Sequence, residues 1–210
     1  LLLSFSLLFI GLIIAMTLNQ NFLYILVFYI ILQISYCFYL KNIPLVEFFC
    51  IASGFIIRSV AGGLASELFI SSWFFLCLGM LSLFIALEKR KAEILTLNNL
   101  NILTRKVLNK YSIKLIDKFQ SILSSCTVIT YSLWTINPIV GNYKSPWMIL
   151  TIPLVIMGIF RYQMIGERFI DSNKTQNILE TPENVIIYDR PIQIIIFSWL
   201  FIIIFIGLLS

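Results

Sequence analysis

Residues 1–40 read LLLSFSLLFIGLIIAMTLNQNFLYILVFYIILQISYCFYL and contain no charged side chain. A membrane-spanning helix needs about 20 consecutive, mostly apolar residues, so this stretch is long enough for two. The polar run Asn-Gln-Asn at 19–21 divides it near the middle. The sequence therefore predicts two transmembrane helices here, over residues 1–18 and 22–40, joined by a short polar turn.

The rest of the chain continues the same pattern. We expect five further spans, at residues 45–64, 70–87, 119–136, 147–165 and 191–210. Charged residues make up 12% of the 210 residues, whereas a soluble domain averages about 25%. A soluble domain, a disordered chain and a disulfide-rich scaffold are therefore excluded. The predicted fold class is an all-α, multi-pass transmembrane helical bundle of about seven spans, which forms a single transmembrane domain over residues 1–210.

The chain contains no histidine, and its four cysteines stand singly in apolar segments. A Ser-His-Asp or Cys-His catalytic relay and a histidine-ligated zinc site are therefore excluded. Single cysteines of this kind are typical of helix interfaces. A metal ion would have to be held by oxygen ligands, which favours magnesium.

The charged residues are distributed unevenly between the two ends of the predicted helices. Of the 15 basic residues, Lys144 falls at one end, Arg58 lies inside a span, and all the others fall at the opposite end. Basic loops stay in the cytoplasm, so that end is predicted to be the cytoplasmic face of an inner or plasma membrane. Nine of the ten acidic residues, all except Glu67, lie at the same end. Carboxylates among cations at one membrane face indicate a polar working site there.

A basic amphipathic helix is predicted over residues 106–119, from the polar stretch 88–118 into the start of the fifth span. Two neighbouring stripes recur at i, i+4 spacing: Lys106, Lys110, Lys114 and Lys118, and beside them Val107, Tyr111, Leu115 and Phe119. A helix with two such faces can lie on anionic lipid headgroups or draw anionic substrates to the membrane. Both interpretations stay open.

Arg58 lies deep inside the predicted span 45–64. Placing an arginine there costs at least about 2.5–3.5 kcal/mol, so we expect it to face a polar cavity and to have an anionic partner. The small residues around it, between Ser53 and Gly63, allow another helix to approach closely. A salt bridge to a neighbouring helix or an anionic group of a substrate would satisfy it.

Further candidate residues gather where spans end at the predicted cytoplasmic face. They are Tyr36 and Lys41 at the second span, Glu47 at the third, Lys89, Arg90 and Glu93 at the fourth, Arg161 at the sixth, and Asp189 and Arg190 before the seventh. Membrane anchoring or snorkelling would explain each cation alone. Together they fit an anionic, phosphorylated substrate. The sequence contains no phosphate-loop, dinucleotide-binding or nucleophile-elbow motif.

Several short motifs, in order over most of the chain, resemble those of one enzyme family. They are GFIIRSVAG at 54–62, SWFFLC at 72–77, LFIALEKRKAE at 83–93, VLNKY at 107–111, TYSL at 130–133, TIP at 151–153, GIFRY at 158–162, PE at 182–183 and DRP at 189–191. The pattern is similar to the decaprenyl-phosphate phosphoribosyltransferase branch of the UbiA-type polyprenyl transferases. The resemblance implies a membrane enzyme of about nine spans that serves cell-envelope biosynthesis. Such an enzyme transfers 5-phosphoribosyl from phosphoribosyl diphosphate to a polyprenyl (decaprenyl) phosphate, with Mg2+ and release of diphosphate.

The chain departs from this family at its two aspartate-rich motifs. The first, NDxxDxxxD, holds the magnesium–diphosphate in the family and is absent here. We therefore expect a fragment that lacks the first two spans and that loop, and that is inactive alone. The second motif, DxxxD-like in ordinary prenyl transferases, is replaced by the cation-rich sequence at 88–93. Cations at this place suit direct contact with a substrate phosphate.

The resemblance and the charges together assign roles to the candidate residues. We expect substrate or phosphate contacts from Tyr36, Lys41, Arg58, Lys89, Arg90, Arg161 and Arg190, and contacts with metal or ribose from Glu47, Glu93 and Asp189. The expected partners are phosphoribosyl diphosphate, a polyprenyl phosphate and the membrane, with no nucleic acid. Two other functions stay open: UbiA-type transfer of a prenyl group from a prenyl diphosphate to an aromatic or other acceptor, and a non-catalytic membrane or transporter subunit.

Overall fold

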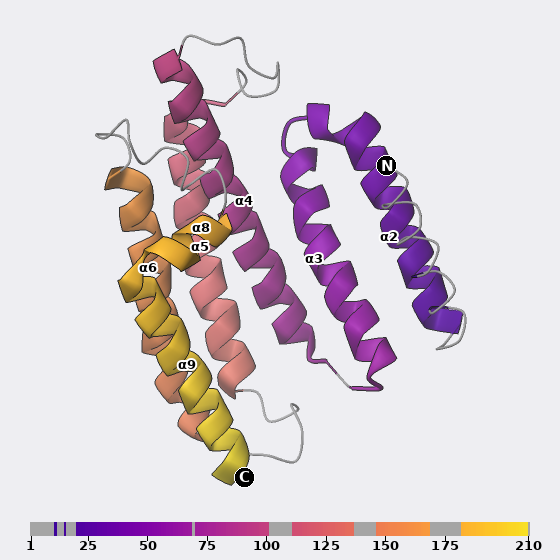
Figure 1. Ribbon diagram of the computed structural model, residues 1–210, viewed down its shortest axis with the longest axis vertical. Coiled ribbons are helices and arrows are strands. Elements are labelled where there is room, and N and C mark those ends of the chain that lie inside the picture. Colours follow the sequence, from indigo (N-terminus) through magenta and orange to yellow (C-terminus); the bar gives the residue numbers. More distant parts are fainter. Residues whose placement is uncertain are drawn as a thin grey trace.

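The computed structural model describes residues 11, 15, 20–68, 70–100, 111–136, 146–168 and 182–209, and over these it consists of helices and short turns (Figure 1). The helices are α2 (Gln20–Phe38), α3 (Val46–Ala65), α4 (Ser72–Leu100), α5 (Ile113–Ile136), α6 (Ile152–Arg168), α8 (Pro182–Tyr188) and α9 (Arg190–Leu209), with two 3-10 turns, η1 (Leu40–Asn42) and η3 (Pro146–Thr151). No strand occurs in these ranges. The predicted all-α, multi-pass bundle is confirmed.

Five helices in the described ranges are long and apolar enough to cross a membrane. Their spans are Gln20–Phe38, Val46–Ala65, Ser72–Ile94, Trp147–Glu167 and Arg190–Leu208. They confirm five of the predicted spans, and the chain is an integral membrane protein. The predicted first span, 1–18, lies outside the described residues except for Gly11 and Ala15.

The predicted fifth span forms the 24-residue helix α5, but this helix is too polar to count among the five. Its serine and threonine hydroxyls donate to carbonyl oxygens of the preceding helical turn. Examples are Thr127 to Leu123 (2.7 Å) and Ser132 to Val128 (2.8 Å). Such bonds satisfy the hydroxyls within the helix itself. Although α5 is rich in serine and threonine, few of its hydroxyls therefore need a partner outside the helix.

Consecutive helices run in opposite directions, so their charged ends meet at one end of the bundle, the upper end in Figure 1. Helices α2, α3, α4 and α5 pack side by side in chain order, and α6 packs against α9. The short helix α8 lies across the longer helices, at about mid-height in Figure 1. We call the upper, charged end of the bundle the polar end. It corresponds to the end that the sequence predicts to be cytoplasmic.

Helix α4 lies between two clusters of buried side chains. One cluster contains Phe48, Ala86, Leu87, Ile94, Tyr111 and Ile116, and the other contains Phe84, Ala92, Ile159, Tyr162, Ile165, Val185 and Ile192. Residues of α4 belong to both clusters. In the first cluster they pack against residues of α3 and α5, and in the second against residues of α6, α8 and α9. A helix buried on more than one face carries apolar residues all round. Helix α4 is therefore the central element on which both halves of the bundle pack.

Two predictions for the polar stretch 88–118 are wrong. Helix α4 does not end at residue 87 but runs to Leu100, so the charged run 88–93 is helical. The predicted amphipathic helix over 106–119 is interrupted, because Tyr111 and Ser112 are not helical. The Ser112 hydroxyl accepts a hydrogen bond from the backbone N–H of Leu115 at 3.2 Å and caps the start of α5. Residues 106–110 lie outside the described residues.

The second predicted polar stretch, 166–190, contains structure that the sequence did not predict. Helix α6 continues to Arg168, and α8 forms before the last span. Proline lacks a backbone N–H and has a fixed φ, which suits the first helical turn. Pro182 and Pro191 occupy that position in α8 and α9.

Candidate functional site

Four consecutive charged residues, 88–91, lie on α4 at the polar end. Glu88, Arg90 and Lys91 are 2%, 4% and 7% exposed, whereas Lys89 is exposed. Neighbouring residues on a helix point about 100° apart, because 3.6 residues make a turn. The run therefore directs three of its charges into contacts with other helices and one outward.

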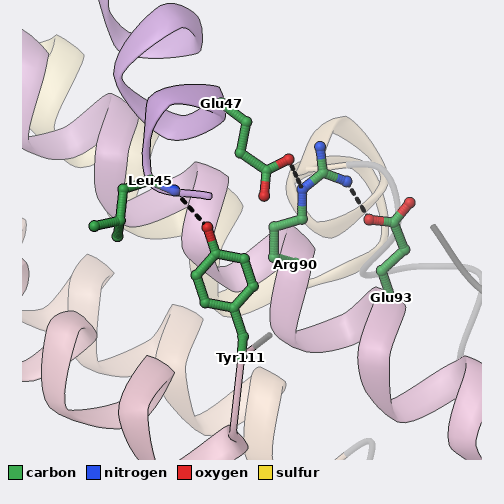
Figure 2. Close-up of polar contacts among 5 residues, drawn as sticks. All are labelled: Leu45, Glu47, Arg90, Glu93 and Tyr111. Atoms are coloured by element: carbon green, nitrogen blue, oxygen red, sulfur yellow. Dashed lines mark hydrogen bonds and ion pairs between the residues drawn. The ribbon is translucent and has the colours of Figure 1, made fainter. Parts of the chain in front are cut away.

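Arg90 joins α4 to α3 through a buried ion pair. Its Nε lies 3.1 Å from Oε2 of Glu47, which is 1% exposed at the start of α3. Its Nη1 donates to Oε2 of Glu93 one turn further along α4. Figure 2 shows the guanidinium between these two carboxylates, and Tyr36 of α2 lies within electrostatic reach of it. The structure thus brings three of the predicted site residues, Glu47, Arg90 and Glu93, into contact, with Tyr36 in their surroundings.

Tyr111 supports the turn that leads into α3. Its hydroxyl accepts a hydrogen bond from the backbone N–H of Leu45 at 2.6 Å (Figure 2), and its ring packs on Phe48 with centroids 5.4 Å apart. Leu45 has a φ of 66°, and a positive φ costs energy in a residue other than glycine. Burial raises the pKa of Tyr111, and the nearby Glu47 carboxylate adds to this rise. Tyr111 therefore stays protonated and holds the strained residue that precedes Glu47.

A second polar contact joins α4 to α5 and α6. Lys91 Nζ lies 2.7 Å from Oδ1 of Asp117, and the carboxylate of Glu88 lies beside the buried side chain of Gln120. The space for Glu88 depends on a glycine in α6, because a Cβ added at Gly166 would lie 2.9 Å from its Oε2. None of these residues is among the candidate site residues named from the sequence, although Glu88 and Lys91 belong to the cation-rich run 88–93. The i, i+3 spacing of Glu88 with Lys91 and of Asp117 with Gln120 is the sequence signal that could have indicated their contacts.

Arg161 and Asp189 form a bidentate pair between α6 and the start of α9. Nε of Arg161 lies 3.2 Å from Oδ1 of Asp189, and Nη2 lies 2.7 Å from Oδ2. Oδ1 also accepts the backbone N–H of Ile192 at 2.9 Å, so Asp189 caps α9. Two parallel hydrogen bonds fix the plane of a guanidinium. Arg161 is therefore held in one orientation and keeps further N–H groups for another ligand.

The other predicted cations at the polar end are Lys41 in η1, Lys89 in α4 and Arg190 at the start of α9. Within the described ranges none of them forms an ion pair with a carboxylate. Lys89 and Arg190 are exposed, and Lys41 is half-buried. We call these three residues the rim cations.

The structure does not bring Arg58 to this group. It lies eleven residues after Glu47 on α3, which is about 16 Å along the helix axis, and its side chain is exposed. Nε donates to the carbonyl oxygen of Gly54 at 3.2 Å, and the guanidinium lies 4.5 Å from the ring centre of Phe55 and 5.9 Å from that of Tyr29. In the described part of the chain, ring faces and a backbone carbonyl take the place of the expected anionic partner.

Comparison with curated proteins gives four matches of the same name, three of which are described here, although no family model matches the chain. A protein of Mycolicibacterium smegmatis is 29% identical over 197 residues, covering 90% of this chain and 59% of the relative. One of Corynebacterium glutamicum is 30% identical, covering 84% and 51%, and one of Mycobacterium tuberculosis is 27% identical, covering 89% and 58%. Each is named decaprenyl-phosphate phosphoribosyltransferase. This chain is their relative.

The resemblance stated from the motifs is thereby confirmed for most of the bundle. The chain spans only 51–59% of the length of these decaprenyl-phosphate phosphoribosyltransferases. What their names say about substrates therefore applies to the relatives as whole proteins.

The resemblance implies a magnesium site, for which the carboxylates at the polar end are the candidate protein ligands. The described residues contain no group of three or more cysteine, aspartate or glutamate residues that could hold a metal ion. Of the two carboxylates on Arg90, Glu47 is enclosed, and the side chain of Glu93 is 25% exposed. Glu93 could contribute one ligand at most, and the remaining ligands would have to come from elsewhere.

Proposed function

We propose that the intact protein transfers the 5-phosphoribosyl group of phosphoribosyl diphosphate to a polyprenyl phosphate, with decaprenyl phosphate as the acceptor. The observation that carries this proposal is the similarity of 84–90% of the chain to curated proteins of that name. The polar end supports it, because three rim cations and the oriented Arg161 lie at the same end of an apolar bundle. An anionic substrate and a lipid can meet at such a boundary.

In the proposed reaction, an oxygen of the lipid phosphate attacks the anomeric carbon of the ribose. The new carbon–oxygen bond forms as the bond from that carbon to the diphosphate breaks, and diphosphate leaves with the bonding electron pair. No covalent enzyme intermediate is required, so the task of the protein is to position two phosphorylated substrates and to balance their charge. The side chains proposed for this task are Lys41, Lys89, Arg161 and Arg190.

The buried residues of the site act indirectly in this proposal. Arg90, with Glu47 on one side and Glu93 on the other, fixes α3 against α4 and so fixes the direction of Lys89. Glu93, the more exposed of the two carboxylates, is placed to meet a ribose hydroxyl or Mg2+. We retain Mg2+ as a proposed cofactor, which when bound to the diphosphate would neutralise charge on the leaving group. The polar end is proposed to face the cytoplasm, on the basis of the positive-inside rule.

The test of the proposed function is an assay of the intact protein in lipid nanodiscs. Labelled phosphoribosyl diphosphate with decaprenyl phosphate should give a labelled lipid and free diphosphate. A labelled prenyl diphosphate with an aromatic acceptor should give no product. Transfer of the prenyl group, or failure to consume either donor, would contradict the proposal.

A pair of lysine variants tests the role of the rim cations. Lys89→Ala should raise the KM for phosphoribosyl diphosphate about tenfold to a hundredfold, because a hydrogen bond to a charged group contributes about 1.5–3 kcal/mol. Lys118→Ala is the matched control, since Lys118 is an exposed lysine of α5 at the same end and its loss changes the net charge equally. We expect its KM to change less than twofold. Equal effects of the two variants would show that only general electrostatic attraction is at work.

A further inference from the structure

The turn between η1 and α3 is built around a strained residue. Leu45 has a φ of 66° and a ψ of −45°, and across it the backbone N–H of Val46 donates to the carbonyl oxygen of Pro44 at 2.8 Å. This pattern is that of the γ-turn with positive φ, which has dihedral angles of about 75° and −65° and is rare because it is strained. Glycine would adopt it without steric cost, whereas the leucine side chain found here is 46% exposed. Packing of that side chain therefore contributes little to holding the turn.

Tyr111 supplies a hydrogen bond that holds the turn from outside. Its hydroxyl accepts the backbone N–H of Leu45 at 2.6 Å, across 66 positions of sequence (Figure 2). Tyr111 is 8% exposed and belongs to a buried cluster with Phe48 of α3 and with Leu87 and Ile94 of α4. The packed ring fixes the position of the hydroxyl. Relaxation of Leu45 would break this hydrogen bond at a place that excludes most water, which is costly.

The conformation of Leu45 also determines where Lys41 lies relative to α3. Lys41 belongs to η1, four residues before Leu45, and η1 is closed by a hydrogen bond from the backbone N–H of Ile43 to the carbonyl oxygen of Leu40 at 3.1 Å. A change of φ at Leu45 to the usual value of about −60° is a rotation of about 125°, which would swing η1 as a unit relative to α3. Four residues span up to about 13 Å, so Lys41 would move by several ångströms. Productive contacts with a substrate require placement to within about 1 Å.

We propose that Tyr111 is a positioning residue for Lys41. Its hydroxyl keeps the γ-turn formed, and the turn keeps the ammonium group of Lys41 where it can meet a phosphate of phosphoribosyl diphosphate. The inference rests on the proposed function, since it concerns the binding of that donor substrate. The other cations proposed for this task lie on α4, α6 and α9, outside the turn. Loss of the hydroxyl should therefore displace one cation and leave the others in place.

Three single variants allow a test in the intact protein. Tyr111→Phe removes the hydroxyl and keeps the ring beside that of Phe48, whose centroid is 5.4 Å away. Leu45→Gly removes the strain, because glycine reaches a positive φ freely. Tyr131→Phe is the matched control, since Tyr131 is 5% exposed near the opposite end of the bundle and its hydroxyl accepts the indole N–H of Trp199 at 2.7 Å. A general loss of stability should appear in both tyrosine variants.

We expect Tyr111→Phe to raise the KM for phosphoribosyl diphosphate at least fivefold, because apparent affinity falls with the fraction of molecules in which the turn is formed. Its kcat and its KM for decaprenyl phosphate should change less than twofold, as for a contact that binds the donor equally before and during the reaction. Tyr131→Phe should leave all three constants within twofold of the parent. An unchanged donor KM in Tyr111→Phe, or an equal rise in Tyr131→Phe, would overturn the inference.

Two double variants test the route from Tyr111 to the substrate. In the Leu45→Gly background the strain is absent, so adding Tyr111→Phe should raise the donor KM less than twofold. In a Lys41→Ala background the ammonium group is already missing, so adding Tyr111→Phe should again raise it less than twofold. A full fivefold rise in the first background would exclude the turn as the means. Rises that multiply in the second would show that Tyr111 acts by another route, and the inference would fail.

Hydrogen exchange and equilibrium binding separate this inference from the proposed activity. Backbone amides in peptides that cover residues 39–48 should exchange at least tenfold faster in Tyr111→Phe than in the parent or in Tyr131→Phe, because local opening exposes them. Labelled phosphoribosyl diphosphate should bind Tyr111→Phe at least fivefold more weakly. If exchange and binding change in this way but the parent transfers nothing, the proposed function fails and the positioning role stands. If all three proteins exchange and bind alike, the positioning role fails whatever the activity.

Discussion

The buried pair between Glu47 and Arg90 gives a quantitative prediction. Glu47→Gln removes the charge that faces Nε of Arg90 at 3.1 Å, in a place where both side chains are almost inaccessible to water. Removing one partner of a buried ion pair costs about 3–5 kcal/mol, because the other charge stays buried. Glu93 still binds Arg90, so we expect the lower end of this range, about 3 kcal/mol.

The assay is thermal unfolding of the detergent-solubilised protein, followed by the circular dichroism of its helices. For a protein of 150–250 residues, 1 kcal/mol shifts Tm by about 2–4 °C, so Glu47→Gln should lower Tm by about 6–12 °C. Glu67→Gln is the control, because Glu67 is exposed after α3. We expect its Tm to change by less than about 2 °C, in line with exposed sites elsewhere.

A double variant tests whether the cost arises from the uncompensated charge. In Glu47→Leu/Arg90→Met both buried charges are gone, and Glu93, which is partly exposed, can be solvated. Replacing a whole buried pair by apolar residues is often neutral or stabilising, so the double variant should regain at least half of the loss seen for Glu47→Leu alone. The reasoning is refuted if the double variant loses as much stability as Glu47→Leu and Arg90→Met, measured singly, lose in sum. It is also refuted if Glu47→Gln unfolds at the temperature of Glu67→Gln.

Two further predictions concern the contacts between the other helices. Gly166→Ala places a Cβ 2.9 Å from the Glu88 carboxylate, so this buried side chain must shift, and the gain of about 1 kcal/mol that alanine normally gives over glycine inside a helix should be lost. The same change made in a Glu88→Ala background should give that gain, and an equal effect in both backgrounds would exclude the contact as the cause. Asp189→Ala should cost about 1–2 kcal/mol through loss of the cap of α9, and Asp189→Asn should restore part of it, measured by the same unfolding assay. Equal losses in the two Asp189 variants would show that the cap contributes nothing.

The apolar spans could be predicted because each depends on its own residues. An uncharged run of about 20 residues becomes a helix across a membrane wherever its neighbours lie. The bounds of α2, α3 and α9 therefore lie close to the predicted ones. The positive-inside rule likewise needs only the order of the loops and their basic residues. From these it predicts that most candidate residues lie at one end of the bundle.

The end of α4 could not be predicted, because it depends on partners far along the chain. A run of charges normally marks the place where a membrane helix meets water. Here Glu47 of α3 and Asp117 of α5 meet Arg90 and Lys91, which lets the helix continue with both cations buried. Nothing in residues 88–91 alone distinguishes the two outcomes. The sequence places Tyr111 on the apolar stripe of an amphipathic helix, whereas in the structure it turns inward. The cause is again a partner far along the chain, because its hydroxyl binds the backbone N–H of Leu45.

The charge balance of this cluster changes the interpretation of the motif at 88–93. By sequence it is rich in cations, but in the structure Lys89, Arg90 and Lys91 are accompanied by four carboxylates, those of Glu47, Glu88, Glu93 and Asp117. Opposite charges at contact distance cancel most of their field beyond the pair. A diphosphate approaching the polar end would therefore meet little attraction from Arg90 or Lys91. In the proposed function its binding would depend on Lys89, on Lys41 of η1 and Arg190 of α9, and on any metal ion that accompanies it. Arg161 is itself paired with Asp189 and would contribute its remaining N–H groups rather than a net charge. The buried pairs hold the backbone that presents Lys89.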